Sequence, residues 1–167
     1  MDATTLWCFL VTVFGFVLIA VLLYKNRRPS TWFLAFFLFI YTYGSLVLFL
    51  FITRYLLEVP FLYRTGWFFL YISAPALLFY VIYLFNEQRS LRWKDALHLI
   101  PALVYLVDLM PYFLLSNEHK RDVLIAVFEN QALTALFREG WILANGMHVL
   151  LKHGIALGYI LYIALMV

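Results

Sequence analysis

Five apolar runs, each about the length of a bilayer-crossing helix, constrain the fold of this chain more than any other feature. A helix needs about 20 apolar residues to cross the roughly 30 Å hydrocarbon core of a membrane. Backbone polar groups inside lipid must pair within their own segment, and a helix achieves this. A transmembrane barrel would instead need polar–apolar alternation, which these runs lack. The runs cover residues 6–24, 32–52, 67–85, 96–115 and 147–167.

The overall composition also indicates lipid as the solvent. Apolar residues make up 66% of the 167 residues and charged residues 13%, whereas a soluble domain has about 45–50% and about 25%. A domain this small has too much surface for its volume to bury so many apolar side chains. We therefore expect an all-α, polytopic transmembrane helix bundle, with the lipid bilayer as its partner. It should form a single transmembrane domain over residues 1–167 that is incomplete, because the chain stops within the fifth span.

The basic residues predict the orientation of these helices. The first and third connections carry six lysines and arginines, against five in the second and fourth, and cytoplasmic loops are enriched in such residues. No basic side chain precedes the first run, whereas Lys25, Arg27 and Arg28 follow it, which is typical of an uncleaved anchor that exports its own N-terminus. We therefore expect a multi-pass protein of the cell inner membrane with its N-terminus outside. The net charge of +3 resides in these clusters and does not predict direct nucleic-acid binding.

The long fourth connection predicts a helix on the outer surface. Within residues 122–139, Ile125, Phe128, Ala132 and Leu136 fall on one helical face, and the charged residues lie mainly off it. This pattern is typical of an amphipathic helix in the membrane interface. A sixth short span is the weaker alternative, because a Glu-Asn-Gln tripeptide would then lie in the middle of the membrane.

Asp108 is the one acidic residue inside a predicted span. A carboxylate in the hydrocarbon core costs a few kcal/mol, so this side chain should face other helices or water. His148 and Lys152 lie near the outer end of the fifth run, and Arg54 lies at the outer end of the second. These positions suggest an outward-facing polar pocket in which Asp108 opposes a basic partner, with Lys152 as the specific candidate. The favoured alternative is a purely structural role for Asp108.

The remaining sequence patterns do not predict catalysis, metal binding or haem binding. The sequence contains none of the common catalytic motifs, its one cysteine lies within the first run, and its histidines share no helical face that would suit a metal or haem. We therefore expect no enzyme activity and no cofactor.

Gly154 and Gly158 have the spacing that lets two membrane helices approach closely. Packing within the bundle and a homodimer explain this spacing equally well.

A distinctive pattern runs from the third span to the fourth connection. It comprises Pro75-Ala-Leu-Leu-Phe-Tyr-Val-Ile-Tyr-Leu, then Leu91-Arg-Trp-Lys-Asp-Ala-Leu-His-Leu-Ile-Pro101, then Pro111-Tyr-Phe-Leu-Leu-Ser. In these motifs the chain resembles bacterial membrane-bound regulators whose N-terminal polytopic region precedes a cytoplasmic AraC-type helix-turn-helix domain. The resemblance covers residues 5–167. The family often has glycine before the first proline, where this chain has Ala74.

The resemblance implies a membrane-embedded sensor or anchor module of a transcription regulator. The DNA-binding domain of such regulators is absent from these residues, so this chain itself should not bind DNA. The alternative is a small transporter or channel subunit, in which Asp108 and Lys152 would line the pathway. Internal repeats would favour a transporter, and none is evident in the sequence.

Overall fold

The computed structural model describes residues 2–130 and 140–166, and all of the secondary structure in these residues is helical. Short 3-10 helices, labelled η, connect some of the α-helices. In chain order the elements are α1 (Ala3–Lys25), α2 (Pro29–Ile52), η1 (Tyr55–Leu57), η2 (Pro60–Leu62), α3 (Thr65–Phe85), η3 (Trp93–Leu99), α4 (Ile100–Asp108), α5 (Met110–Phe113), α6 (Asn117–Glu129) and α8 (Asn145–Met166).

Within the described residues, four helical stretches are long and apolar enough to cross a membrane. They correspond to four of the five predicted runs: Ala3–Lys25, Pro29–Ile52, Pro60–Phe85 and Gly146–Met166. The all-helical fold and the membrane character predicted from the sequence are thereby confirmed.

The fourth predicted run, residues 96–115, is not one continuous helix. It consists of η3, α4 and α5, with a break at Leu109. Pro101 and Pro111 each lie in the first turn of a helical segment. Proline lacks the N–H that a helix interior requires but is well suited to a first turn. The two prolines therefore favour separate short helices where hydropathy alone predicted a single span.

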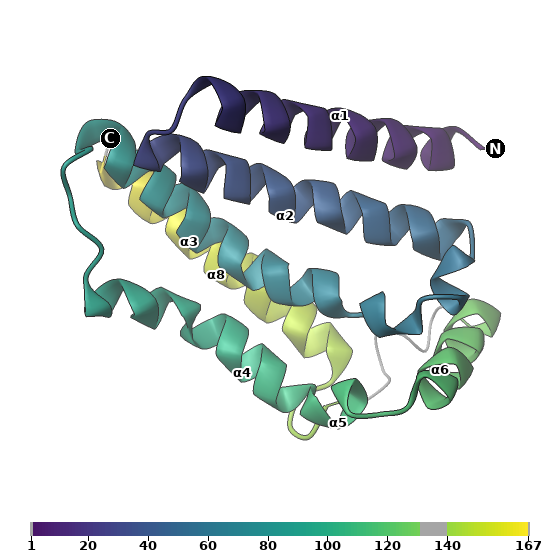
Figure 1. The fold of residues 1–167 in the computed structure, drawn as a ribbon. Helices are drawn as coiled ribbons and strands as arrows, with labels where there is room; N and C mark the ends of the chain where they lie inside the picture. Colours follow the sequence, from purple (N-terminus) through teal and green to yellow (C-terminus); the bar gives the residue numbers. More distant parts are fainter. Residues whose placement is uncertain (1, 131–139, 167) are drawn as a thin grey trace.

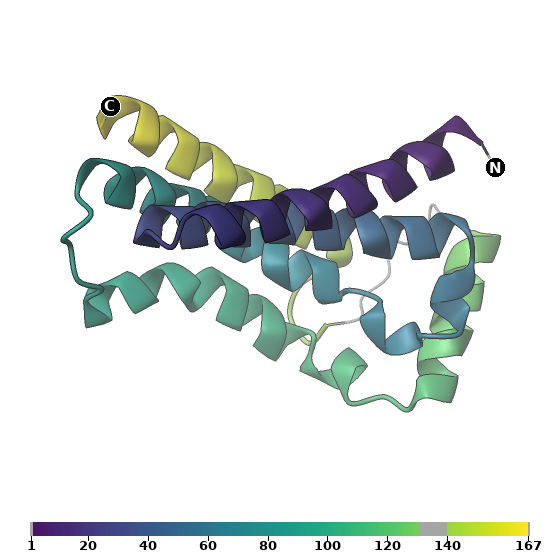
Figure 2. The same cartoon turned by 45° about the horizontal axis from the view of Figure 1, so that its top comes forward.

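The long helices lie side by side, with α2 packed on α1 and α3, and α3 packed on α8 and α4 (Figure 1). The α1–α2 and α3–η3 connections lie at one end of the bundle together with the end of α8, and we call this the basic end. Arg28 and Glu87 join the two connections there by an ion pair of 3.1 Å. The opposite end, here the α6 end, holds η1, η2, α5 and α6. Helix α6 runs across this end in both views (Figure 2).

Small residues bring α1 and α2 into close contact. A Cβ atom added to Gly15 would lie 2.2 Å from Oγ1 of Thr42, so the two backbones approach as only glycine permits. About two helical turns along the same pair of helices, the Ser45 hydroxyl donates to the Cys8 carbonyl at 3.1 Å. Membrane helices associate through such close packing and hydrogen bonding, because lipid gives no hydrophobic drive between them.

Helix α6 differs from the predicted surface helix in its limits and its buried face. It begins at Asn117, after Ser116 caps it, and ends at Glu129. Leu124 and Val127 are its buried apolar residues, whereas Ile125, assigned to the apolar face, is 41% exposed. The contact of α6 with η1 and η2 buries Leu124 and Val127, and the placement of the exposed Ile125 in the membrane interface stays a prediction. Two further residues of the predicted face, Ala132 and Leu136, lie outside the described residues.

Candidate functional site

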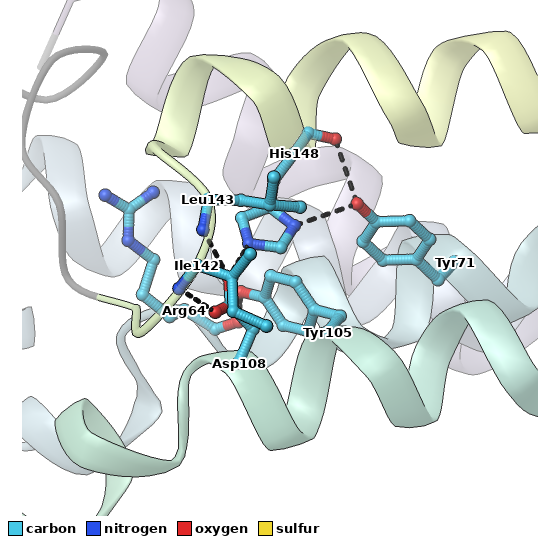
Figure 3. A network of polar contacts seen from close by, with 7 residues as sticks. All are labelled: Arg64, Tyr71, Tyr105, Asp108, Ile142, Leu143 and His148. Carbon is cyan, nitrogen blue, oxygen red and sulfur yellow. Dashed lines mark hydrogen bonds and ion pairs between the residues drawn. The ribbon is translucent and has the colours of Figure 1, made fainter.

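Asp108 is the centre of a buried polar network at the α6 end (Figure 3). Its carboxylate accepts hydrogen bonds from the backbone N–H groups of Ile142, at 2.6 Å to Oδ1, and Leu143, at 3.3 Å to Oδ2. Oδ2 is also 2.8 Å from Nε2 of His148. Asp108 and His148 are each only 1% exposed. Burial of a carboxylate is tolerated when donors surround it in this way.

The segment before α8 is shaped to receive this carboxylate. Successive backbone N–H groups form a concave anion site of the kind found at many phosphate and carboxylate contacts. At its start, a Cβ atom on Gly140 would lie 2.7 Å from Oδ2 of Asp108, so the close approach requires glycine. The next residue, Trp141, donates its N–H to the Asp108 carbonyl at 3.0 Å. The segment is therefore fastened to the end of α4 by both side-chain and backbone atoms.

His148 extends the network from α4 and α8 to α3. Its Nδ1 lies 3.1 Å from the Tyr71 hydroxyl, which is also 3.1 Å from the His148 carbonyl oxygen. A second tyrosine, Tyr105, places its ring 5.0 Å from the imidazole and donates its hydroxyl to the Arg64 carbonyl at 2.9 Å. These contacts join three helices around one imidazole.

Two cationic side chains, Arg64 and Lys152, lie beside this network. The Arg64 guanidinium carbon lies 4.6 Å from the centroid of the Trp67 ring, and Nζ of Lys152 lies 4.1 Å from the same centroid. Arg64 is 4% exposed and has a left-handed backbone with φ of 70° at the start of α3. Lys152 was the expected partner of Asp108, but the structure gives that position to His148, one helical turn earlier.

The other predicted site residues lie elsewhere. Arg54 is exposed at the end of α2, and its guanidinium carbon lies 5.4 Å from the Phe128 ring centroid on α6. Gly154 and Gly158 are exposed on α8, and a Cβ atom on either would meet nothing within 4 Å. Close packing within the bundle therefore does not explain these two glycines, and a homodimer stays a prediction.

Sequence reasoning missed Arg64, Tyr71, Tyr105 and the amides that bind Asp108. The chain contains 12 tyrosines, and nothing in their spacing marks these two. One signal was available. Gly140 precedes the last apolar run, and glycine there permits the close backbone approach that a buried carboxylate needs.

A cavity of about 360 Å³ lies beside the network. It is bounded by α2, α3, α6 and α8, and its lining is largely apolar. Arg64 and Trp67 contribute to its wall, as does Val149, the residue after His148. The lining residues are Gly44, Val47, Leu48, Phe51, Leu56, Tyr63, Arg64, Gly66, Trp67, Leu70, Val127 and Val149.

Helix α8 has a second polar attachment at the basic end. There Nδ1 of His98, on η3, contacts the Tyr159 hydroxyl of α8. Over the part of the chain that the structure describes, no group of three or more His, Cys, Asp or Glu side chains could hold a metal ion. The histidines at the two ends instead fix α8 to α3, α4 and η3.

Comparison with known proteins identifies no relative. No protein-family model matches the sequence, and the searches of curated proteins and of solved structures returned no match.

Proposed function

We propose that this chain is a membrane-embedded sensor and anchor module, without enzyme activity, that receives a signal at its α6 end and transmits it through α8. The observation that carries the proposal is the attachment of α8. Its first turn is held by the buried Asp108–His148–Tyr71 network, and Tyr159 is held at the opposite end by His98. Between these points α8 packs mainly on α3. A change at the network would therefore be passed along a rigid helix to the basic end.

The proposed topology has five spans with the N-terminus outside. The fourth span is the broken segment over residues 96–115, which begins within η3 and continues through α4 and α5, and it runs from the basic end to the α6 end beside α3 (Figure 1). Since cytoplasmic loops are enriched in Lys and Arg, we assign the basic end to the cytoplasm of a bacterial inner membrane. Outward exposure of the α6 end makes the Asp108 network the signal-receiving side.

The proposed output is regulation of transcription. Support comes from the resemblance of residues 91–101 and their flanking proline motifs to membrane-bound AraC-type regulators. In that arrangement the cytoplasmic end of α8 would carry the signal toward a DNA-binding domain. The chain described here would act as the sensor and anchor, with no nucleic-acid contact of its own.

The experiment measures whether the network controls the far end of α8. Spin labels at Leu84 of α3 and Leu161 of α8, both exposed, report the helix separation at the basic end in nanodiscs after Cys8→Ala. Asp108→Asn replaces a carboxylate oxygen with an NH2 group, which cannot accept hydrogen bonds from the surrounding N–H donors. We therefore expect the distribution of distances between the two labels to shift or broaden. Glu58→Gln, in an exposed ion pair at the α6 end, is the matched control and should leave it unchanged. Identical distributions for wild type and Asp108→Asn would reject the proposal.

Transport is the second candidate, and the break at Leu109 favours it. Transporters bind substrates where a membrane helix is interrupted, and Asp108 lies directly before such a break. The contacts of Asp108 argue against transport. Its oxygens already accept two backbone hydrogen bonds and contact His148, so they are not available to a substrate. Uptake of protons or organic ions into proteoliposomes, if abolished by Asp108→Asn, would favour transport over sensing.

A further inference from the structure

A second cavity lies at the basic end, between α2, α3 and η3. Its volume of about 340 Å³ lies within the roughly 300–1,000 Å³ of typical small-molecule pockets. Apolar side chains form most of its wall, among them Phe36 of α2, Ile72 and Phe79 of α3, and Leu99 of η3. Phe36 is 37% exposed and Leu99 is 40% exposed, so the cavity opens to the molecular surface. We call it the basic-end groove.

The apolar part of the groove is elongated. Ile72 and Phe79 are seven residues apart on α3, which corresponds to about 10 Å of helix rise. Between them Ala76 contributes only a methyl group to the wall. The lining residues of α2 and α3 belong to two stretches that are long and apolar enough to cross a membrane. An elongated apolar space that opens on the exposed side of two such helices suits a hydrocarbon chain of the bilayer.

The polar part of the groove is formed by Arg92 and Asp95. The Asp95 carboxylate accepts hydrogen bonds from the Arg89 guanidinium at 2.6 Å and from the backbone N–H of Arg92 at 2.8 Å. Its negative charge is therefore compensated within the protein. The Arg92 side chain is exposed and forms no ion pair with any residue that the structure describes. The lining therefore carries one uncompensated positive charge.

The surroundings of Arg92 are also basic and lie at the level of lipid head groups. Residues 25–28 and 86–95 carry six basic and two acidic side chains, a net charge of +4. Trp93, next to Arg92, is 74% exposed, and Trp32 in the first turn of α2 is 54% exposed. Exposed tryptophans of membrane helices prefer the head-group region. Basic pockets between membrane helices at this depth bind anionic lipid head groups.

We propose that the basic-end groove binds an anionic phospholipid, with one acyl chain in the apolar part and the phosphate at Arg92. A soluble anion would leave the apolar wall unused. A zwitterionic lipid would bring an ammonium group into the same positive field. The inference goes beyond the proposed sensor function and does not depend on it. The bound lipid would join η3 to α2 and α3.

Photo-crosslinking in vesicles tests this site. The full chain is reconstituted into equal parts of phosphatidylglycerol and phosphatidylcholine, and a trace of one of the two lipids carries a diazirine in an acyl chain. Mass spectrometry gives the ratio of phosphatidylglycerol to phosphatidylcholine crosslinks at Phe36 and Leu99. Phe14 of α1, which is 67% exposed and outside the lining, is the internal reference. We expect the ratio at the groove to exceed that at Phe14 about tenfold. Because both leaflets have one composition, the result does not depend on the orientation of the chain.

Two pairs of variants localise the lipid. Arg92→Gln should lower the ratio at the groove about fivefold, the factor that corresponds to the roughly 1 kcal/mol of one basic residue near an anionic membrane. Arg27→Gln removes the same charge at the same end but outside the lining, and should leave the ratio nearly unchanged. Ala96, an exposed residue of the lining, is replaced in Ala96→Phe, which fills the groove and should abolish the crosslinks of both lipids there. Ala20→Phe, on the exposed face of α1, should not.

Three results would overturn the inference. The first is an equal ratio at the groove and at Phe14. The second is an equal decrease in Arg92→Gln and Arg27→Gln, which would indicate a general attraction of lipid to the basic end. The third is the absence of crosslinks from either lipid at the groove, which would show that another protein segment covers it. If Ala96→Phe does not fold, Arg92→Gln keeps the test decisive, because this side chain is exposed.

Discussion

The carboxylate of Asp108 and the imidazole of His148, 40 residues apart in the chain, lie 2.8 Å from each other and are both almost fully buried. This contact joins the end of α4 to the first turn of α8. Because both partners are shielded from water, each would lose its hydrogen-bond partner without the other, so the contact stabilises the attachment of α8 to α4.

Asp108→Ala and His148→Leu should each destabilise the protein by about 3 kcal/mol, because either change leaves buried polar groups without a partner. The double variant should lose less than the sum of the two. Denaturant unfolding in mixed micelles measures all four corners of this cycle. As a control, Glu58→Gln breaks an exposed pair with Arg121 of 3.5 Å and should cost less than about 1 kcal/mol. Strict additivity would show that the two residues act independently.

Gly15 and Gly44 should respond oppositely to the same substitution. Gly15→Ala brings a Cβ to within 2.2 Å of Thr42 Oγ1 and should destabilise the α1–α2 pair by about 1–3 kcal/mol. Gly44→Ala meets no atom within 4 Å and should be neutral or stabilise the helix by up to about 1 kcal/mol. Thermal unfolding followed by circular dichroism compares the two. Adding Thr42→Ala should recover part of the Gly15→Ala loss, and a failure to do so would contradict the close contact.

Asp95 should give the basic end a pH-dependent stability. The backbone N–H of Arg92 and then the Arg89 guanidinium hold the pKa of the Asp95 carboxyl below its ordinary value of 3.8. Because this pKa is lower in the folded than in the unfolded state, the ionised carboxylate stabilises the fold fully at pH values above the unfolded-state pKa. The stabilisation is lost as the pH falls through the folded-state pKa.

The free energy of unfolding of the wild type should therefore exceed that of Asp95→Asn by a margin of about 1 kcal/mol. This margin, measured by thermal unfolding at each pH, should stay constant from pH 7 down to about pH 5. The margin should shrink below pH 3.8. Glu87→Gln, in an exposed pair with Arg28, serves as the control and should show a much smaller margin. A margin that grows as the pH falls would contradict the assigned sign.

Single cysteines in a Cys8→Ala background test the orientation. Asn26 and Gln88 are exposed at the basic end, and Asn117 is exposed at the start of α6. We expect an impermeant thiol reagent to label cysteine at Asn117 in intact cells and to label the other two only after lysis. Labelling of Asn26→Cys or Gln88→Cys in intact cells would reverse the topology.

Gly154 and Gly158 test self-association. Both are exposed on α8, so leucine at either position should leave the monomer folded. If these residues form a homodimer contact, each substitution should reduce the crosslinked dimer fraction in bilayers several-fold, because large side chains separate the helix backbones. Circular dichroism provides the folding control. An unchanged dimer fraction would exclude this face as the contact.

The sequence predicted the helical spans well because apolar length is a local property. The break at Leu109 was missed because hydropathy averages over the prolines that start α4 and α5. The partner of Asp108 could not be chosen by spacing. His148 and Lys152 are four residues apart, on one helical face, and the fold of the 140–144 segment decides between them.

Arg64 illustrates a different limit. Its left-handed backbone, with φ of 70°, is uncommon for a residue other than glycine, asparagine or aspartate. Contacts formed by distant residues maintain it, among them the Tyr105 hydroxyl from α4. No local pattern could have predicted the conformation or the burial of this side chain.

The donors that surround Asp108 also impose an order on biogenesis. Its two amide partners are 34 and 35 residues further along the chain, and His148 is 40. While the ribosome still holds those residues, the carboxylate has none of these donors, and lipid penalises it by a few kcal/mol. On the proposed topology, we therefore expect the segment containing α4 to enter the bilayer only together with α8.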